Sequence, residues 1–318
     1  MEFDLPCELS DNKFMKIKRI LIASLWCLVA VSCAGKQETS IATPEMTTEH
    51  ISGWVVYSAT VSQEPFVAQI FLENLDTGEI TQLTSSGHNR FPKWSPDGSK
   101  IVFVSLTKEN REDIYIMNKD GSDQAPIVAT PADELMPDWS PDGKQVVYSS
   151  YTRDNISEIY LIDIVTKNIK RLTSTTEWAY SPTWSVDGEL IAFTSGQPDS
   201  KSQIYAMNND GTDVRRITNE GLGYFNHSPV WCPNDSCIVF NGGDGGSELL
   251  LLDLNSLAVS PLLSDVFKSG SLQILPERSS IRGYITFIVG EMSYAMDMKT
   301  KKIYSLGVAN ALDISLYP

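Results

Sequence analysis

The sequence is poor in the residues that most often carry metal-dependent or nucleophilic chemistry. Its 318 residues include only three histidines and five cysteines. Basic residues are also in the minority, since 25 lysines and arginines face 40 aspartates and glutamates, for a formal net charge of −15. A chain this acidic repels phosphate backbones and anionic lipid headgroups. The composition therefore argues against nucleic acid and against an anionic membrane surface as partners.

Catalytic motifs are missing as well. The sequence contains no Gly-x-Ser-x-Gly nucleophile elbow, no His-Glu-x-x-His zinc motif, no P-loop and no dinucleotide-binding glycine fingerprint. The three histidines, His50, His88 and His227, are far apart in the sequence. We therefore expect no catalytic residues, no metal site built from clustered ligands and no bound cofactor.

Long apolar runs are equally scarce. The run from Ile20 to Val31 has twelve residues, too few to span a bilayer comfortably as a permanent helix, and it follows a basic stretch ending at Arg19. This pattern predicts a secretory signal peptide that starts at Met15. Within residues 1–33, the end of the signal, Ala30-Val31-Ser32-Cys33, resembles a bacterial lipobox. The resemblance implies cleavage before Cys33 and lipid attachment to its thiol; the alternative is an ordinary signal that leaves a soluble exported protein.

Residues 34–49 are polar, rich in Thr and Glu, and without apolar periodicity. This composition predicts a flexible tether between the anchor and a folded domain that begins at residue 50.

What the sequence does contain is one short phrase in four copies. Trp94-Ser95-Pro96-Asp97-Gly98 recurs from Trp139 after 45 residues. It recurs with Val186 in place of proline from Trp184 after another 45, and in more altered form from Trp231 after 47. An apolar run follows each copy. Because Pro fixes its φ angle and Asp and Gly tolerate turn geometry, each copy predicts a tight turn between two strands. A fixed period of this length indicates a modular array.

Two further strands follow each turn within the same period. The first has a central aromatic residue, as at Ile114-Tyr115, and the second is short and ends as in Arg171-Leu172-Thr173. Four short strands per 45 residues predict one blade of a β-propeller. Second strands begin at positions 55, 101, 146, 191, 238 and 284. We therefore predict an all-β fold, a six-bladed propeller of four-stranded blades over residues 50–318.

The first and last blades depart from the repeat. No first strand precedes Trp54, but the segment 314–318 at the chain end aligns with residues 92–96 of the first copy. We expect this C-terminal strand to join the blade that begins at Trp54, which closes the ring and removes exposed sheet edges. The sixth blade retains only a degenerate first strand, expected at Leu272 to Leu275.

Cys232 and Cys237 flank the fourth turn, where they replace Ser95 and Lys100 of the first copy. These two positions face each other across the turn, and an exported protein meets an oxidising compartment, so the pair predicts a disulfide. Free thiols are the alternative, and a zinc site would need two more ligands.

The succession Trp-Ser-Pro-Asp-Gly, Ile-x-Phe-x-Ser, Ile-Tyr-x-Met, Asp-Gly and Arg-Leu-Thr resembles the TolB-type six-bladed propeller over about residues 50–318. The resemblance implies the propeller fold, a central channel in which a cation such as calcium can bind, and, by analogy, a peptidoglycan-associated lipoprotein as partner. Authentic TolB carries an N-terminal α/β domain before its propeller, whereas only the tether is expected here.

Candidate binding residues lie in the loops that vary between blades. In a propeller, the fourth-to-first and second-to-third strand loops share one face, and the Pro-Asp-Gly turns lie on the other. Tyr, Trp and Arg dominate interface energy, so variable loops that carry them predict a recognition surface. The alternative is ordinary solvated loops, and the recurring Trp and Tyr of each blade are expected to pack between blades instead. The candidate residues are His88, Arg90, Glu134, Trp178, Tyr180, Tyr224, Phe225 and His227.

These observations predict a non-catalytic propeller that binds a protein or peptide in the bacterial envelope. It would be held in the membrane only by a lipid on Cys33 and face the periplasm or the cell surface, or else be soluble in the periplasm. The alternative is an enzyme or binding protein for a small molecule or carbohydrate in the central channel, with His227 and Glu134 as base and acid.

Overall fold

The computed structural model describes residues 44–107, 110–152, 154, 156–174, 177–196, 201–218, 226–243, 248–263, 266, 277–278 and 283–317. Their regular structure is β-strand, and none of them belongs to a helix long and apolar enough to cross a membrane.

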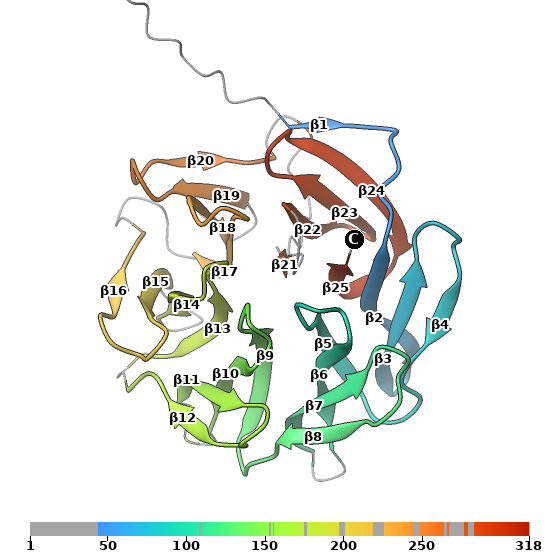
Figure 1. The fold of residues 1–318 in the computed structure, drawn as a ribbon, viewed down its shortest axis with the longest axis horizontal. Helices are drawn as coiled ribbons and strands as arrows, with labels where there is room; N and C mark the ends of the chain where they lie inside the picture. Colours follow the sequence, from blue (N-terminus) through green and yellow to red (C-terminus); the bar gives the residue numbers. More distant parts are fainter. Residues whose placement is uncertain are drawn as a thin grey trace, which may run out of the picture. The chain divides into compact units, whose positions relative to one another are not determined.

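The described strands form six sheets, the blades of a propeller, around a central axis (Figure 1). Within each blade the strands run antiparallel from an inner first strand to an outer fourth strand. This arrangement confirms the predicted fold class. The blades are: blade 1, β25 (Ala311–Tyr317), β2 (Trp54–Gln63), β3 (Phe66–Asn74) and β4 (Ile80–Gln82); blade 2, β5 (Asn89–Trp94), β6 (Lys100–Leu106), β7 (Glu112–Asn118) and β8 (Ala125–Val128); blade 3, β9 (Asp133–Trp139), β10 (Gln145–Tyr151), β11 (Ser157–Asp163) and β12 (Ile169–Arg171); blade 4, β13 (Ala179–Trp184), β14 (Leu190–Ser195), β15 (Gln203–Asn208) and β16 (Arg215–Arg216); blade 5, β17 (His227–Trp231), β18 (Cys237–Gly242), β19 (Glu248–Asp253) and β20 (Val259–Pro261); blade 6, β21 (Glu277–Arg278), β22 (Tyr284–Val289), β23 (Met292–Asp297) and β24 (Lys302–Ala309).

The chain end closes the ring as predicted. In blade 1, Leu316 of β25 lies opposite Val55 of β2, in the register that sets Trp94 opposite Ile101 in blade 2. The last strand of the chain therefore completes the first blade, and Figure 1 shows β25 beside β2 near the centre of the ring.

Two details near the ends of the propeller differ from the prediction. The first strand of blade 6 is Glu277–Arg278, where Arg278 pairs with Ile285, and residues 272–275 lie outside the described part of the chain. Residues 45–46, expected in the tether, form β1, which pairs in parallel with Lys302 and Ile303 at the outer edge of blade 6. The free edge of β24 offers backbone hydrogen bonds that the composition of the tether does not reveal.

The core consists of apolar clusters that each join two neighbouring blades. Among the described residues there are six such clusters, and one of them joins Ile288 and Tyr304 of blade 6 to Val55 and Leu316 of blade 1. The four repeated tryptophans lie in these clusters and are at most 3% exposed. The repeat therefore encodes contacts between blades, as the even spacing of its aromatic residues predicts.

The repeated turns hold themselves by one set of hydrogen bonds. The Ser95 hydroxyl donates to Asp97 at 2.6 Å and accepts the Lys100 N–H at 2.9 Å, while Asp97 also accepts the Ser99 N–H at 3.0 Å. The hydrogen bond from the Ser95 hydroxyl, which has the largest effect, and the one from the Ser99 N–H lower the pKa of Asp97. The turns at Ser140 and Ser185 repeat these contacts. The repeated Asp therefore has a structural role.

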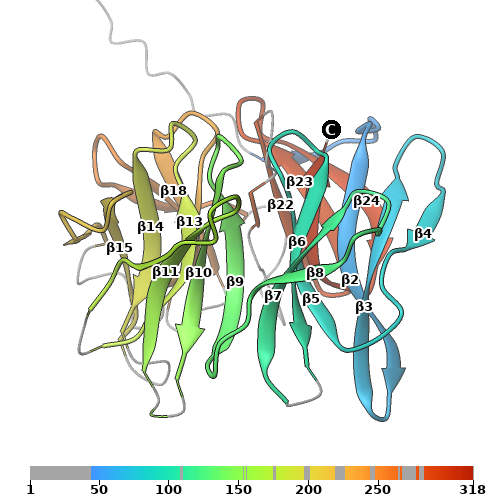
Figure 2. The ribbon, with the colours of Figure 1, turned by 60° about the horizontal axis from the view of Figure 1, so that its bottom comes forward.

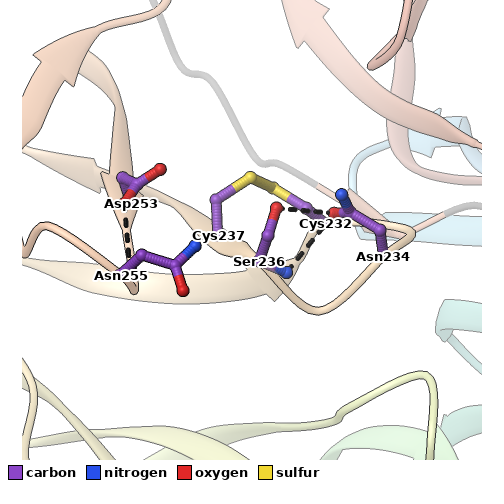
Figure 3. The surroundings of a disulfide bond; sticks show 6 residues. All are labelled: Cys232, Asn234, Ser236, Cys237, Asp253 and Asn255. Carbon is purple, nitrogen blue, oxygen red and sulfur yellow. Dashed lines mark hydrogen bonds between the residues drawn. A yellow bond between two sulfur atoms is a disulfide. The ribbon is translucent and has the colours of Figure 1, made fainter.

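In the fourth turn, a disulfide joins Cys232 to Cys237, with their Cα atoms 5.2 Å apart (Figure 3). It links the two positions that the serine hydroxyl and the backbone N–H connect in the other turns. Asn234 takes the place of the turn aspartate and accepts the Ser236 N–H at 3.3 Å. The crosslink thus replaces a hydrogen bond of the repeat with a covalent bond.

Candidate functional site

The described parts of the loops predicted to bind a partner lie together on one face of the blades. Where the fourth-to-first and second-to-third connections are described, they are at the lower edge of the blades in Figure 2, and the repeated turns are at the upper edge. We call this lower edge the loop face. Contacts between the two kinds of loop support this grouping, since the Gly196 N–H at the end of β14 donates to the carbonyl of Trp178 ahead of β13.

A bulge at the same repeat position shapes the inner strands where they start on this face. Phe91, Met136, Ser181 and Ser228 have φ angles of 51–54°, and the pairing register shifts beside each of them. Bulges often re-aim side chains next to binding sites. Since none of the four residues is glycine or asparagine, no sequence signal marks this feature.

Side chains of the preceding blade accept the N–H groups of these bulges. The Ser181 N–H donates to Ser149 at 3.1 Å, and the Ser228 N–H donates to Thr194 at 3.2 Å. At blade 2 the acceptor is Asp313, which takes the Phe91 N–H at 3.2 Å and a hydrogen bond from Ser58. Burial raises the pKa of Asp313. The inner ends of the loops are therefore fixed by the blades behind them.

His88 and Arg90 lie at the junction of blades 1 and 2. The Nδ1 atom of His88 accepts the Ala68 N–H at 2.9 Å, and its ring lies 5.3 Å from that of Phe66. Burial, and then the nearby Arg90, lower the pKa of His88. Arg90 forms an ion pair with Glu112. The side chains of both candidates thus hold the loops in place. Phe66, which lies against His88, is 50% exposed.

Trp178 and Tyr180 form an aromatic group with Tyr151, which the sequence analysis did not single out. The ring of Trp178 meets that of Tyr151 edge to face, with centroids 5.8 Å apart. All three side chains are partly exposed, and Ile156 beside them is 47% exposed. Burial raises the pKa of Tyr151 and Tyr180, so both hydroxyls are neutral at physiological pH. The group combines rigid rings with polar tips, the pattern of interface anchors.

Glu134 is buried, unlike the other candidates that the structure describes. It is 0% exposed at the start of β9 and accepts a hydrogen bond from Thr130. Burial is the main cause that raises the pKa of Glu134 to about 7; the Thr130 bond opposes it, and the nearby Asp113 adds to it. This carboxyl group therefore changes charge near neutral pH.

His227 begins the inner strand of blade 5, and its Nδ1 atom lies 3.1 Å from the Ser228 hydroxyl. Blade 4 stands between it and Glu134 in blade 3, so the two residues considered as base and acid come from different blades. Tyr224, Phe225 and Cys33 lie outside the described residues. Within the described part of the chain, no group of three or more His, Cys, Asp or Glu side chains is placed to hold a metal ion.

Comparison with known proteins agrees with this architecture. A solved structure of TolB from Acinetobacter baumannii is similar with a TM-score of 0.68 at 21% identity, over 85% of this chain and 68% of that one. An oligogalacturonate lyase from Vibrio parahaemolyticus is similar with a TM-score of 0.54 at 15% identity, over 83% and 86%. Identities this low establish the fold alone. The six sheets place this chain in the class of six-bladed propellers.

The family follows from the sequence itself. The model of the TolB beta propeller domain matches residues 33–153 and 137–282, so the chain belongs to the TolB beta-propeller family. The Tol-Pal system protein TolB of Campylobacter jejuni strain RM1221 is 39% identical over 51 residues, which are 16% of this chain and only 13% of that protein.

Proposed function

We propose that this protein is a non-catalytic propeller that recognises a protein or peptide of the bacterial envelope through its loop face. The observation that carries the proposal is the partly exposed aromatic group of Trp178, Tyr180 and Tyr151, with Ile156 at its edge. Aromatic side chains that are already held in place lose little entropy on binding, which is why they dominate interface energies.

The long hairpin of β2 and β3 adds a second contact on the same face. These strands have 10 and 9 residues, longer than their counterparts in other blades, and Phe66 lies at the tip (Figure 2). The name of the Campylobacter relative supports a partner in a Tol-Pal system, and a peptidoglycan-associated lipoprotein is the partner we would test first. A lipid on Cys33 would hold the propeller at the membrane surface.

Site-specific crosslinking tests this assignment. A photoreactive residue placed at Ile156 in cells should crosslink to the peptidoglycan-associated lipoprotein, and Trp178→Ala with Tyr180→Ala should abolish that crosslink with a nearly unchanged melting temperature. A probe at Val165, which is 82% exposed in a turn on the opposite face, is the matched control. Equal crosslinking from both positions, or from the double variant, would remove the loop face from consideration. Mass spectrometry of the mature N-terminus tests the lipid on Cys33 separately.

A further inference from the structure

Near the loop face, a repeated polar network closes the junction between neighbouring blades. Between blades 1 and 2, Gln69 accepts hydrogen bonds from Thr84 at 2.6 Å and from Asn89 at 2.9 Å. Between blades 4 and 5, the equivalent Gln203 accepts them from Thr218 at 2.7 Å and from Asn226 at 3.3 Å. We call this the Gln–Thr–Asn network.

The junction between blades 2 and 3 has different residues at all three positions. Asp113, Val128 and Glu134 stand where Gln69, Thr84 and Asn89 stand. Tyr115 pairs with Pro126 as Phe71 pairs with Gln82, and Glu134 pairs with Ser150 as Asn89 pairs with Ser105. Val128 has no hydroxyl to bridge the other two side chains. Two carboxyl groups therefore face each other in the interior, and Asp113 helps to raise the pKa of Glu134.

A pocket of about 650 Å³ opens at this altered junction. Its wall combines hydroxyl groups with apolar surface, and most of it comes from blade 3 and from the connection that leads into it. Thr130, the hydrogen-bond partner of Glu134, is part of the wall. A volume of this size accommodates a small organic molecule. The lining residues include Arg111, Thr130, Tyr148, Ser150, Tyr160 and Ile169.

Two buried polar atoms at this site have no hydrogen-bond partner among the described residues. One is Nε of Arg111, in the pocket wall, and the other is Oε2 of Glu134, directly behind Thr130. Buried polar groups are normally satisfied, so the donor left over in the pocket wall is available to a ligand or a water molecule. The Nε atom of Arg90 also has no hydrogen-bond partner among the described residues, but its guanidinium group forms an ion pair with Glu112.

We propose that this pocket binds a small organic carboxylate, with the Arg111 guanidinium group on the carboxylate. Arginine is suited to this role because its planar donors match a carboxylate in a bidentate pair. The rings of Tyr148 and Tyr160, 5.9 Å apart, and Ile169 contact the apolar part of the ligand. Since Asp113 and Glu134 lie behind the wall, a singly charged carboxylate is favoured over a doubly charged phosphate.

The same surroundings make binding depend on pH. Glu134 is faced by Asp113 of blade 2, by Asp133 of its own strand and by Tyr148 of β10, while Arg111 is the cation of the pocket wall. Below a pH of about 7 Glu134 is neutral and does not repel the ligand. Above it the carboxylate is charged, so the affinity falls as the pH rises.

Calorimetric titration of the full-length protein tests the proposal with 4-hydroxyphenylacetate and its amide, and with a short peptide ending in Tyr with a free or amidated C-terminus. We expect an acid to bind at least about tenfold more tightly than its amide, since a charge-assisted bond is lost. A preference for the free acid or for the peptide tells whether the natural ligand is a metabolite or a chain end. Acid and amide bound equally, or neither bound at millimolar concentration, would refute the proposal.

Two variants keep the test independent of folding. Arg111→Gln should weaken binding of the acid about tenfold or more, and Arg215→Gln, which removes an exposed arginine paired with Asp213, should not. Glu134→Gln should retain binding and lose its dependence on pH between 6 and 8. Unchanged affinity in Arg111→Gln, with a normal melting temperature, would also overturn the assignment. Crosslinking from Ile156 is unaffected by either outcome, so the two proposals can fail separately.

Discussion

The repeat is more regular on the face that carries the repeated turns, which we call the turn face, than on the loop face. On the turn face, three turns use one set of hydrogen bonds, from Ser95, Ser140 and Ser185, and the fourth keeps the geometry with a disulfide. On the loop face, equivalent positions carry Asn89, Glu134 and Ala179. The repeated residues hold the turns of the blades that carry them, and the departures on the loop face mark positions that differ between blades.

The largest difference in stability is expected between two variants, one that lacks a repeated tryptophan of the core and one that lacks a tryptophan of the loop face. Trp231 is 2% exposed, and its Nε1 atom donates to the Thr183 carbonyl of blade 4 at 3.1 Å. Trp231→Ala should lower the free energy of unfolding by about 3–5 kcal/mol through the cavity that it leaves. Trp178→Ala, on the loop face, should cost less than about 1 kcal/mol. Urea denaturation of both variants checks this, and similar losses would mean that the loop face is part of the core.

Local turn chemistry and periodicity explain why so much of the fold could be predicted from the sequence. The regular spacing of the second strands predicted six blades, and the alignment of residues 314–318 with residues 92–96 located the closing strand in its register. Both depend on patterns that each blade carries within itself. The strand at residues 45–46 was missed because it is held by backbone bonds to β24, which any sequence can make.

The candidate site was less predictable because its properties arise between blades. Glu134 looked like a loop residue, but in the structure it pairs in β9 with Ser150 of β10, is buried, and lies near enough to Asp113 for that carboxylate to add to the rise in its pKa that burial causes. Arg111 and Tyr151 lay within loops that were expected on this face, but nothing in the sequence showed which of them meets a pocket or Trp178. How deeply a side chain is buried and which residue it contacts depend on the tertiary structure, so composition alone does not reveal them.

The second prediction concerns a variant in which the junction between blades 2 and 3 carries the residues of the Gln–Thr–Asn network. Since burial raises the pKa of Glu134 to about 7, the folded state holds a proton between pH 4.5 and 7 that the unfolded state has released. Glu134 therefore makes the protein less stable as the pH rises through this window, by up to about 3 kcal/mol. The triple variant Asp113→Gln, Val128→Thr and Glu134→Asn should show a flatter dependence and greater stability at pH 8.

Unfolding of both proteins by urea at pH 5 and pH 8 measures the difference. The contributions of Asp313 and His88 are common to both and cancel in the comparison. Glu134→Gln alone is a control that removes the titrating group without building the Gln–Thr–Asn network. Parallel pH profiles for wild type and the triple variant would show that Glu134 does not hold its proton in the folded state.

The third prediction exchanges the disulfide of the fourth turn for the hydrogen bonds of the others. Closing a loop of this length with a crosslink stabilises a protein by about 2 kcal/mol in the chain-entropy model. Cys232→Ala with Cys237→Ala should lose that amount. Cys232→Ser with Cys237→Lys restores the residues of the first turn, including a hydroxyl that can reach Asn234, and should recover about 1 kcal/mol. Thermal unfolding under non-reducing conditions ranks the three proteins, and equal losses would show that the turn hydrogen bonds contribute little.

The smallest effect concerns two departures from the repeat that occur together. Val186 stands where the first two copies have proline, and Asp235 stands where they have glycine. The Asp235 carboxylate accepts the N–H groups of Val186 at 2.7 Å and of Asp187 at 2.9 Å, so it caps the turn of the neighbouring blade. Proline has no N–H, which means that one substitution creates the donor that the other satisfies.

A double-mutant cycle measures this coupling. Asp235→Gly alone should destabilise the protein by about 0.5–1 kcal/mol, because the two N–H groups exchange a charged acceptor for water. With Val186→Pro already present, the same change should cost less, since one donor is gone and the left-handed backbone at Asp235, with a φ of 54°, suits glycine. Additive effects of the two substitutions would mean that the turns of blades 4 and 5 are energetically independent despite their contact.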